Sequence, residues 1–212
     1  MSGRAAVFLD RDGVINQNLD GGYVTRWELF HFLPGVLPAL ATLHRHGYPV
    51  IVVTNQAGIG RGLVPAAVVE EIHRRMCAAI EEAGGYIEAV FYCPHHPDER
   101  CDCRKPQPGL LLRAAAELRL DLARSTFVGD HVTDLQAGLA AGCRPLLVRT
   151  GRGRESQAAL AADPALAAAG LVVVDDLAAA AAWIITHYPV SPAPLRLSGR
   201  RASSASRRPS PT

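Results

Sequence analysis

Two aspartates one residue apart follow an apolar segment near the start of the chain. The segment 5–9 has the length and composition of a buried strand, and Asp10 and Asp12 come directly after it, before Gly13. In an open α/β sheet, ligands bind beyond the carboxyl ends of the strands. A carboxylate pair at that place can hold a divalent cation and still offer an oxygen as a nucleophile. The alternative is a β-hairpin, because Asp-Gly between apolar segments is a typical turn.

Further polar residues follow two later apolar segments, lie in the loop between them, or come shortly after the second one. They are Thr54, Asn55, Lys105, Asp130 and Asp134. A hydroxyl and backbone N–H groups can hold phosphate oxygens, and a lysine can neutralise charge on a transferring phosphoryl group. Each residue alone also fits a local role: helix caps at Thr54-Asn55 and at Asp130, and a surface charge at Lys105. Their shared position at strand ends favours a phosphate-transfer site.

Strand-like and helix-like segments alternate along most of the chain. We expect helices over 34–46, 65–83, 109–118 and 132–141, strands over 5–9, 50–53, 87–91, 125–128 and 145–148, and a final strand and helix within 171–187. This alternation predicts an α/β fold with a doubly wound parallel sheet, similar to a Rossmann fold. The segment 14–33 has no clear period, so we interpret it as a loop over the strand ends. Without a long insertion, the fold should have only a minimal cap.

Three of the five cysteines lie within eleven residues, beside two histidines. Cys93, Cys101 and Cys103, with His95 or His96, offer three thiolates and an imidazole, which is a complete tetrahedral zinc set. An odd number of cysteines in this arrangement fits metal binding better than disulfides. Free thiols in a loop are the alternative. Because four protein ligands leave no open position, the zinc would be structural.

Composition separates the chain into two parts. We expect a folded domain over 1–189 and a disordered tail over 190–212, which is rich in arginine, serine and proline. The tail carries five arginines and no acidic residue; subtracting them from the net charge of +2 leaves −3 for the rest. The chain shows neither an apolar segment of about 18 residues nor a signal-peptide pattern, so the expected location is the cytoplasm. We interpret Cys77 and Cys143 as core residues.

The strand-end residues together resemble the haloacid dehalogenase superfamily of phosphatases. The resemblance is carried by Asp10-Arg11-Asp12-Gly13-Val14, Thr54, Lys105 and Gly129-Asp130 with Asp134. Within that superfamily the chain is similar to the heptose bisphosphate phosphatases, with the histidinol-phosphate phosphatases as close relatives. This narrower similarity covers about residues 5–151 and is carried by Val53-Thr54-Asn55-Gln56-Ala57-Gly58-Ile59-Gly60-Arg61-Gly62, Tyr92-Cys93-Pro94-His95-His96-Pro97 and Cys101-Asp102-Cys103-Arg104-Lys105-Pro106.

The resemblance implies a phosphate-transfer chemistry centred on Asp10. This residue would attack phosphorus and form an aspartyl-phosphate, while Asp12 would protonate the departing sugar oxygen and later deprotonate water. That role favours an Asp12 carboxyl with a pKa well above its free value of about 3.9. The resemblance also implies Mg²⁺ held by Asp10, the backbone carbonyl of Asp12, and Asp130. Thr54 and Lys105 would stabilise the equatorial phosphate oxygens.

The resemblance also favours His95 over His96 as the zinc ligand, because the family pattern places the ligand two residues after the first cysteine. Zinc bound by Cys93, His95, Cys101 and Cys103 would hold the loop that carries Lys105. The expected substrate contacts are Asn18, Gly22, Asn55, Gln56, Ala57 and Arg104, with Arg104 binding the sugar or its second phosphate. Arg104 paired with an acidic side chain is the alternative.

The implied substrate is a sugar bisphosphate, a small molecule, and the enzyme is expected to be a monomer. The short segment between His95 and Cys101 is more typical of histidinol-phosphate phosphatases, whereas Gly22-Tyr23-Val24 and Pro106-Gln107-Pro108-Gly109 favour the heptose group. DNA 3′-phosphatases share the Asp-x-Asp-Gly and Thr-Asn core. Five tail charges without interleaved aromatic residues would bind nucleic acid only weakly, so we expect no nucleic-acid partner.

Overall fold

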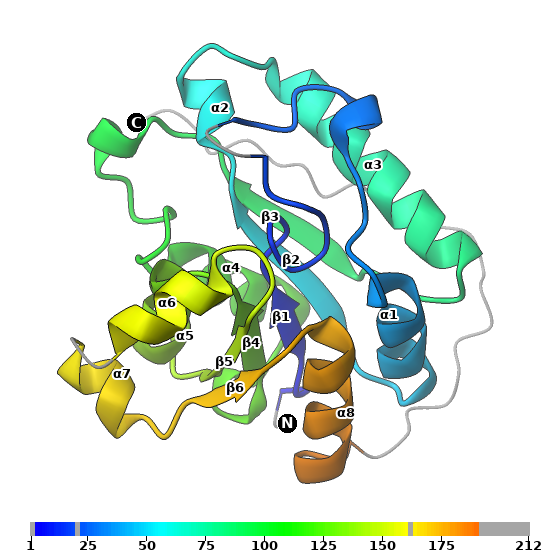
Figure 1. The fold of residues 1–212 in the computed structure, drawn as a ribbon, viewed down its shortest axis with the longest axis vertical. Helices are drawn as coiled ribbons and strands as arrows, with labels where there is room; N and C mark the ends of the chain where they lie inside the picture. The colour runs from blue at the N-terminus through cyan, green and yellow to red at the C-terminus, as the bar shows by residue number, and fades with distance from the viewer. Residues whose placement is uncertain (1–2, 20–21, 161–162, 191–212) are drawn as a thin grey trace.

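Six parallel strands form one sheet at the centre of the molecule (Figure 1). The computed structural model describes residues 3–19, 22–160 and 163–190. In the sheet the strands stand in the order β3-β2-β1-β4-β5-β6, so the first strand lies in the middle. Their bounds are β1 Val7–Leu9, β2 Val50–Asn55, β3 Ala89–Cys93, β4 Thr126–Gly129, β5 Arg144–Val148 and β6 Val172–Val174. The predicted doubly wound parallel sheet is confirmed.

The register of the central strands brings their carboxyl ends to one edge. Leu9 is the register partner of Val52 on β2 and of Val128 on β4, and all three strands run in the same direction. The hairpin alternative for Asp12-Gly13 is therefore wrong, because β1 pairs with two parallel neighbours rather than with a strand that follows it directly. The backbone instead turns at Gly13, which has a φ of 89°.

Alternating side chains of the strands fill two apolar cores, one on each face of the sheet. Val7, Leu9 and Val52 point toward α1 (Val36–Arg45), α3 (Ala66–Glu82) and α8 (Leu177–His187). Phe8, Ile51 and Phe127 point to the opposite face, toward α4 (Gly109–Leu118) and α5 (Val132–Ala140). This period of two explains why the strands read as continuous apolar runs, since both faces are buried. Figure 1 shows α1, α3 and α8 together on one side.

Most predicted elements lie within about two residues of the observed ones, but several short helices were not predicted. These are α2 (Ala57–Gly60), α6 (Gly153–Ala159) and α7 (Pro164–Ala168), and three 3₁₀ turns at Trp27–Leu29, Pro97–Glu99 and Leu122–Arg124. The segment 14–33 covers the strand ends as expected, but it is more than a surface loop. Its side chains Val14, Ile15, Val24 and Phe30 are buried in the core under α1.

Two predictions about the chain as a whole are not decided by the structure. The proposed tail residues 191–212 lie outside the described residues, so the boundary between 189 and 190 stays a prediction. Within the described ranges, no helix has the length and apolar character needed to cross a membrane.

Cys143 is buried and Cys77 packs beside the core, in agreement with their predicted role.

We expect Leu43→Ala to lower the free energy of unfolding by about 2–5 kcal/mol, because it leaves a cavity under α1. Leu43 is fully buried, whereas Leu112 on α4 is 49% exposed. The matched substitution Leu112→Ala should change stability by less than about 0.5 kcal/mol. Urea unfolding of the two variants measures this difference, and equal losses would contradict the described core.

Candidate active site

A cleft of about 670 Å³ opens at the carboxyl edge of the sheet. Asp10 follows β1, Thr54 lies near the end of β2, and Asp130 follows β4, so three neighbouring strands bring them together. Of the eleven residues predicted for catalysis, magnesium or substrate, ten line this cleft: Asp10, Asp12, Asn18, Gly22, Thr54, Asn55, Ala57, Arg104, Lys105 and Asp130. The eleventh, Gln56, lies behind them. Residues 20 and 21 of the predicted substrate loop 18–23 are outside the described residues.

The Lys105 ammonium group joins the acidic residues of the cleft. Its Nζ lies 2.7 Å from Asp10 Oδ1 and 2.7 Å from Asp134 Oδ1, and it donates a hydrogen bond of 3.0 Å to the Val53 carbonyl. The Lys105 side chain is 2% exposed, and its Nζ lies 5.5 Å from the centre of the Phe127 ring. A buried ammonium needs such partners, because an unpaired buried charge is very costly. Lys105 therefore has a fixed position beside Asp10.

Burial and mutual repulsion raise the pKa values of the acidic cluster. Removal from water raises the pKa of Asp10 to about 7, with Lys105 opposing the shift and the charge of Asp134 adding to it. Burial likewise raises the pKa of Asp130 to about 8, with further contributions from Asp10 and Asp134. An additional positive charge in the cleft would favour the ionised form of both carboxylates.

The same cluster has the donor set that Mg²⁺ requires. Carboxylate oxygens of Asp10, Asp130 and Asp134 all lie within 4.8 Å of one another. Asp134 also accepts from the His131 N–H at 3.0 Å and pairs with Lys105, so its oxygens are already engaged. Asp10 and Asp130 remain as the side-chain ligands that fit a hard cation. The Asp12 carbonyl, the third predicted ligand, takes no hydrogen bond from the described residues.

Close backbone approaches hold the Asp130 carboxylate in place. The Arg152 N–H donates to Asp130 Oδ2 at 2.8 Å, and Asn18 Nδ2 donates to the same oxygen at 3.1 Å. A Cβ atom at Gly13 would lie 2.1 Å from this oxygen, and one at Gly151 would lie 2.2 Å from it. Both glycines also have positive φ angles. Side chains at Gly13 or Gly151 would overlap the Asp130 carboxylate, which explains why glycine occurs at both positions.

The expected raised pKa of Asp12 is wrong for this geometry. Despite burial, the Arg11 guanidinium and hydrogen bonds from Asn16 and Gln56 lower the pKa of Asp12 below its usual range. Arg11 Nη2 lies 2.8 and 2.9 Å from the two Asp12 oxygens. Asp12 is therefore a carboxylate here, a form suited to accept a proton from water. No local signal in the sequence predicts this pairing, because the side chain of a residue between two aspartates can point in several directions.

Two amide side chains of β2 and its following turn organise the site from behind. Asn55 pairs with the backbone of Lys105: Lys105 N–H donates to Asn55 Oδ1 at 3.1 Å, and Asn55 Nδ2 donates to the Lys105 carbonyl at 3.2 Å. Gln56 Nε2 lies 3.0 Å from Thr54 Oγ1 and 3.0 Å from Asp12 Oδ2. Asn55 thus positions the lysine, and Gln56 joins the threonine to Asp12.

Arg104, a predicted substrate contact, also lines the cleft. Its Nη1 is buried and has no hydrogen-bond partner among the described residues. A buried guanidinium N–H without a partner is uncommon, because its desolvation is uncompensated. An anionic group entering the cleft would satisfy it.

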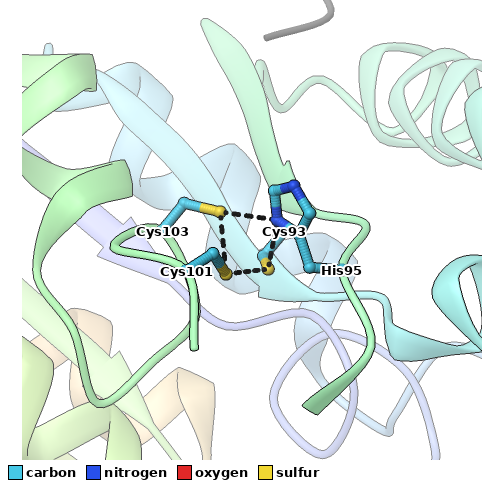
Figure 2. Close-up of side chains that lie close together, drawn as sticks. All are labelled: Cys93, His95, Cys101 and Cys103. Carbon is cyan, nitrogen blue, oxygen red and sulfur yellow. Dashed lines mark hydrogen bonds between the residues drawn. The ribbon is translucent and has the colours of Figure 1, made fainter. Parts of the chain in front are cut away.

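The four predicted zinc ligands meet at one point (Figure 2). Cys93 Sγ lies 3.5 Å from His95 Nδ1 and 3.5 Å from Cys101 Sγ, while Cys103 Sγ lies 3.2 Å from His95 Nδ1 and 3.5 Å from Cys101 Sγ. Zinc bonds of about 2.0–2.3 Å produce tetrahedral edges of about 3.5–3.8 Å. The four atoms therefore have close to the spacing of a tetrahedral zinc site.

His96 has another role, which removes it as a competitor for the metal. Its side chain caps the turn Pro97–Glu99 by accepting from the Asp98 N–H, and its own N–H donates to Glu99 at 2.6 Å. A hydrogen bond from Cys103 is the largest factor that lowers the pKa of Cys93, to about 5, and the same bond raises the pKa of Cys103, so the two thiols share a proton. His95 is the ligand that the geometry supports.

The cluster of Cys93, His95, Cys101 and Cys103 lies next to the end of β2 and the turn that follows it. Cys93 ends β3 as the register partner of Asn55, and the Gln56 N–H donates to the Cys93 carbonyl at 2.8 Å. A Cβ atom at Gly60 in α2 would lie 2.2 Å from the His96 nitrogen, so α2 and the metal loop touch through their backbones. A metal bound by these cysteines would fix the start of the segment that leads to Lys105.

Comparisons with known proteins agree with this geometry. Residues 102–180 match the model of the HAD-hydrolase-like family. The chain is 43% identical to the D-glycero-β-D-manno-heptose-1,7-bisphosphate 7-phosphatase of Pseudomonas putida, over 84% of this chain and 98% of the relative. The crystal structure of the D,D-heptose 1,7-bisphosphate phosphatase of Bordetella bronchiseptica, complexed with magnesium and phosphate, is also similar, with a TM-score of 0.80 and 41% identity over 86% of this chain and 98% of that one. The Burkholderia thailandensis enzyme of the same name has a TM-score of 0.66 and 37% identity, over 86% and 99% of the two chains.

We expect Mg²⁺ to stabilise the protein more at high pH than at low pH. The folded pKa values of Asp10 and Asp130 are raised, so the metal-free protein gains stability from their protons at low pH and loses it as the pH rises through about 7 to 8. Mg²⁺ should raise Tm at pH 8.5 by at least about 2–4 °C more than at pH 6. Thermal unfolding with Mg²⁺ or a chelator measures this. Asp130→Asn should reduce the effect, and a pH-independent shift would contradict it.

We expect one zinc ion per chain in protein with reduced thiols. Cys103→Ser should lower the zinc content strongly, because three ligands hold a structural zinc far less tightly than four. Cys77→Ser is the matched control and should keep its zinc, since Cys77 lies outside the cluster. Elemental analysis of the three proteins gives the answer. Wild-type protein that is folded, reduced and free of zinc would contradict the site.

Proposed function

This chain belongs to the family of D-glycero-β-D-manno-heptose-1,7-bisphosphate 7-phosphatases within the HAD-like hydrolases, and we propose that it removes the 7-phosphate of the heptose bisphosphate. One observation carries the proposal. Lys105 Nζ lies 2.7 Å from Asp10 Oδ1 in a cleft that ten of the eleven predicted residues line. The chain with this cleft aligns with 98% of the heptose bisphosphate phosphatase of Pseudomonas putida. The β anomer is proposed because the curated relatives carry it in their names.

The proposed reaction begins with Asp10 as nucleophile. One Asp10 oxygen forms a bond to phosphorus as the bond from phosphorus to the sugar oxygen breaks, and an aspartyl-phosphate results. Lys105 and the Thr54 hydroxyl are placed to bind the equatorial oxygens, where negative charge is concentrated. A bound Mg²⁺ held by Asp10, Asp130 and the Asp12 carbonyl supplies positive charge that lets two anions approach each other.

Asp12 is the proposed general acid when the aspartyl-phosphate forms and the general base when water hydrolyses it. It gives a proton to the departing sugar oxygen and then takes one from the water that hydrolyses the aspartyl-phosphate. Because Arg11 lowers its pKa, Asp12 carries no proton before substrate binds. The proton must therefore arrive with the substrate, whose phosphate in its monoanionic form can pass it to Asp12 while Arg11 stays paired.

Substrate selection is assigned to the cleft walls. Arg104 offers an unpartnered buried N–H to the second phosphate, and Asn18, Gly22 and Ala57 also line the cleft. The planar fork of an arginine suits a phosphate group better than an ammonium would. We keep as predictions that the protein is a monomer, that it lies in the cytoplasm and that it binds no nucleic acid.

Phosphate release tests the proposed function. With Mg²⁺, the protein should hydrolyse heptose 1,7-bisphosphate at least about tenfold more efficiently than histidinol phosphate or 3′-phosphorylated DNA, and a chelator should abolish turnover. Better turnover of histidinol phosphate would overturn the substrate, and no turnover of any phosphomonoester would overturn the activity.

Asp10→Asn tests the proposed nucleophile. We expect a loss of at least about 10³-fold in kcat, because an amide cannot form the phosphoryl intermediate. Retention of full turnover in Asp10→Asn would exclude Asp10 from this role. Leu112→Ala, on the surface of α4, is the control and should keep wild-type kcat.

A further inference from the structure

The Asp12 carboxylate is surrounded by hydrogen-bond donors. Arg11 Nη2 reaches both oxygens, and Arg11 Nε lies 3.3 Å from Oδ1. Asn16 Nδ2 donates to Oδ1 at 3.0 Å, and Gln56 Nε2 donates to Oδ2 at 3.0 Å. Each oxygen thus has at least two donors, which fixes both the position and the tilt of the carboxylate.

The Arg11 side chain is almost wholly buried, although Arg11 is one of the residues that line the cleft. It is 1% exposed, whereas the Asp12 side chain is 28% exposed. Its remaining terminal nitrogen, Nη1, lies 3.0 Å from Nε2 of His73, and its guanidinium carbon lies 6.0 Å from the centre of the Phe30 ring. A guanidinium is rarely buried this deeply without several partners. The planar guanidinium of Arg11 is therefore a rigid fork, bound to His73 through Nη1 and to Asp12 through Nη2.

His73 is suited only to accept the Arg11 hydrogen bond. Guanidinium nitrogens have protons and no acceptor atoms, so Nε2 must be the unprotonated ring nitrogen. Burial and the Arg11 charge lower the pKa of His73 to about 3, which keeps the ring neutral. His73 is 6% exposed on the inner side of α3, well behind the cleft.

We propose that Arg11 and His73 are positioning residues for Asp12: His73 orients the Arg11 fork, and the fork aims the Asp12 carboxylate at the departing sugar oxygen. This inference rests on the proposed phosphatase function. Gln56 extends the arrangement, because its single amide nitrogen also bonds Thr54. The proton carrier and a phosphate-binding hydroxyl are thereby held at one mutual distance. A displacement of 1 Å at such a group can cost about 10²-fold in rate.

A lysine at position 11 would lack this function. An ammonium group is a point charge on a flexible stem, and it cannot bond both Asp12 oxygens and His73 in fixed directions. Arg11→Lys keeps the charge beside Asp12 but removes the rigid link to α3. This separates the positioning effect from a simple electrostatic one.

The test compares two leaving groups. A sugar alkoxide needs a proton as it departs, whereas the p-nitrophenolate of p-nitrophenyl phosphate leaves as a stable anion. We expect His73→Leu and Arg11→Lys to lower kcat/KM for heptose bisphosphate by about 10²-fold and for p-nitrophenyl phosphate by less than about threefold. His73→Gln, whose amide oxygen can accept from Arg11, should recover most of the loss.

Met76→Ala is the matched control, because Met76 is fully buried on the same helix and has no polar link to the site. It should lower stability and leave the ratio of the two kcat/KM values unchanged. Equal losses on both substrates, or no loss, would overturn the proposal. If His73→Leu does not fold, Arg11→Lys decides alone. A wild-type protein inactive on the sugar bisphosphate would instead overturn the proposed function.

Discussion

The ion pair between Lys105 and the acidic cluster is the interaction on which the site depends. One ammonium group, buried under the edge of the sheet, contacts Asp10 from β1, Asp134 from α5 and a carbonyl of β2. These elements are far apart in the sequence and meet only when the parallel sheet is complete. Breaking such a buried pair costs about 3–5 kcal/mol. The fold and the charge balance of the cleft therefore stabilise each other.

The acidic side chains that line the cleft are only partly balanced by positive charge. Asp10, Asp130 and Asp134 put more negative charge into a small space than Lys105 can balance, and the raised pKa values of Asp10 and Asp130 express that excess. Asp12 stands apart, because Arg11 supplies its counter-charge. The excess negative charge of these carboxylates attracts a cation. The positive charge of that cation then favours the binding of an anionic substrate.

The sequence predicted the sheet and the meeting of the strand-end residues at one edge for a clear physical reason. Apolar runs mark buried parallel strands, and polar residues directly after them must lie at the same edge. Side-chain direction is less predictable. Neither the pairing of Arg11 with His73, sixty-two residues later in the chain, nor the use of the Asn55 amide on the Lys105 backbone leaves a local signal. The short helices α2, α6 and α7 were missed because four to seven residues show little periodicity.

The zinc loop explains how an exposed, irregular segment can deliver a group that must be placed accurately. Residues 94–108 contain one 3₁₀ turn and few apolar side chains, so packing alone gives them little rigidity. A metal bound by Cys93 on β3 and by Cys101 and Cys103 would tie this segment to the sheet two residues before Lys105. Asn55, the register partner of Cys93, then fixes the Lys105 backbone from the neighbouring strand. A bound metal would restrict the backbone of this segment at Cys101 and Cys103. The Asn55 amide restricts the Lys105 backbone, and the ion pair with Asp10 restricts the Lys105 side chain.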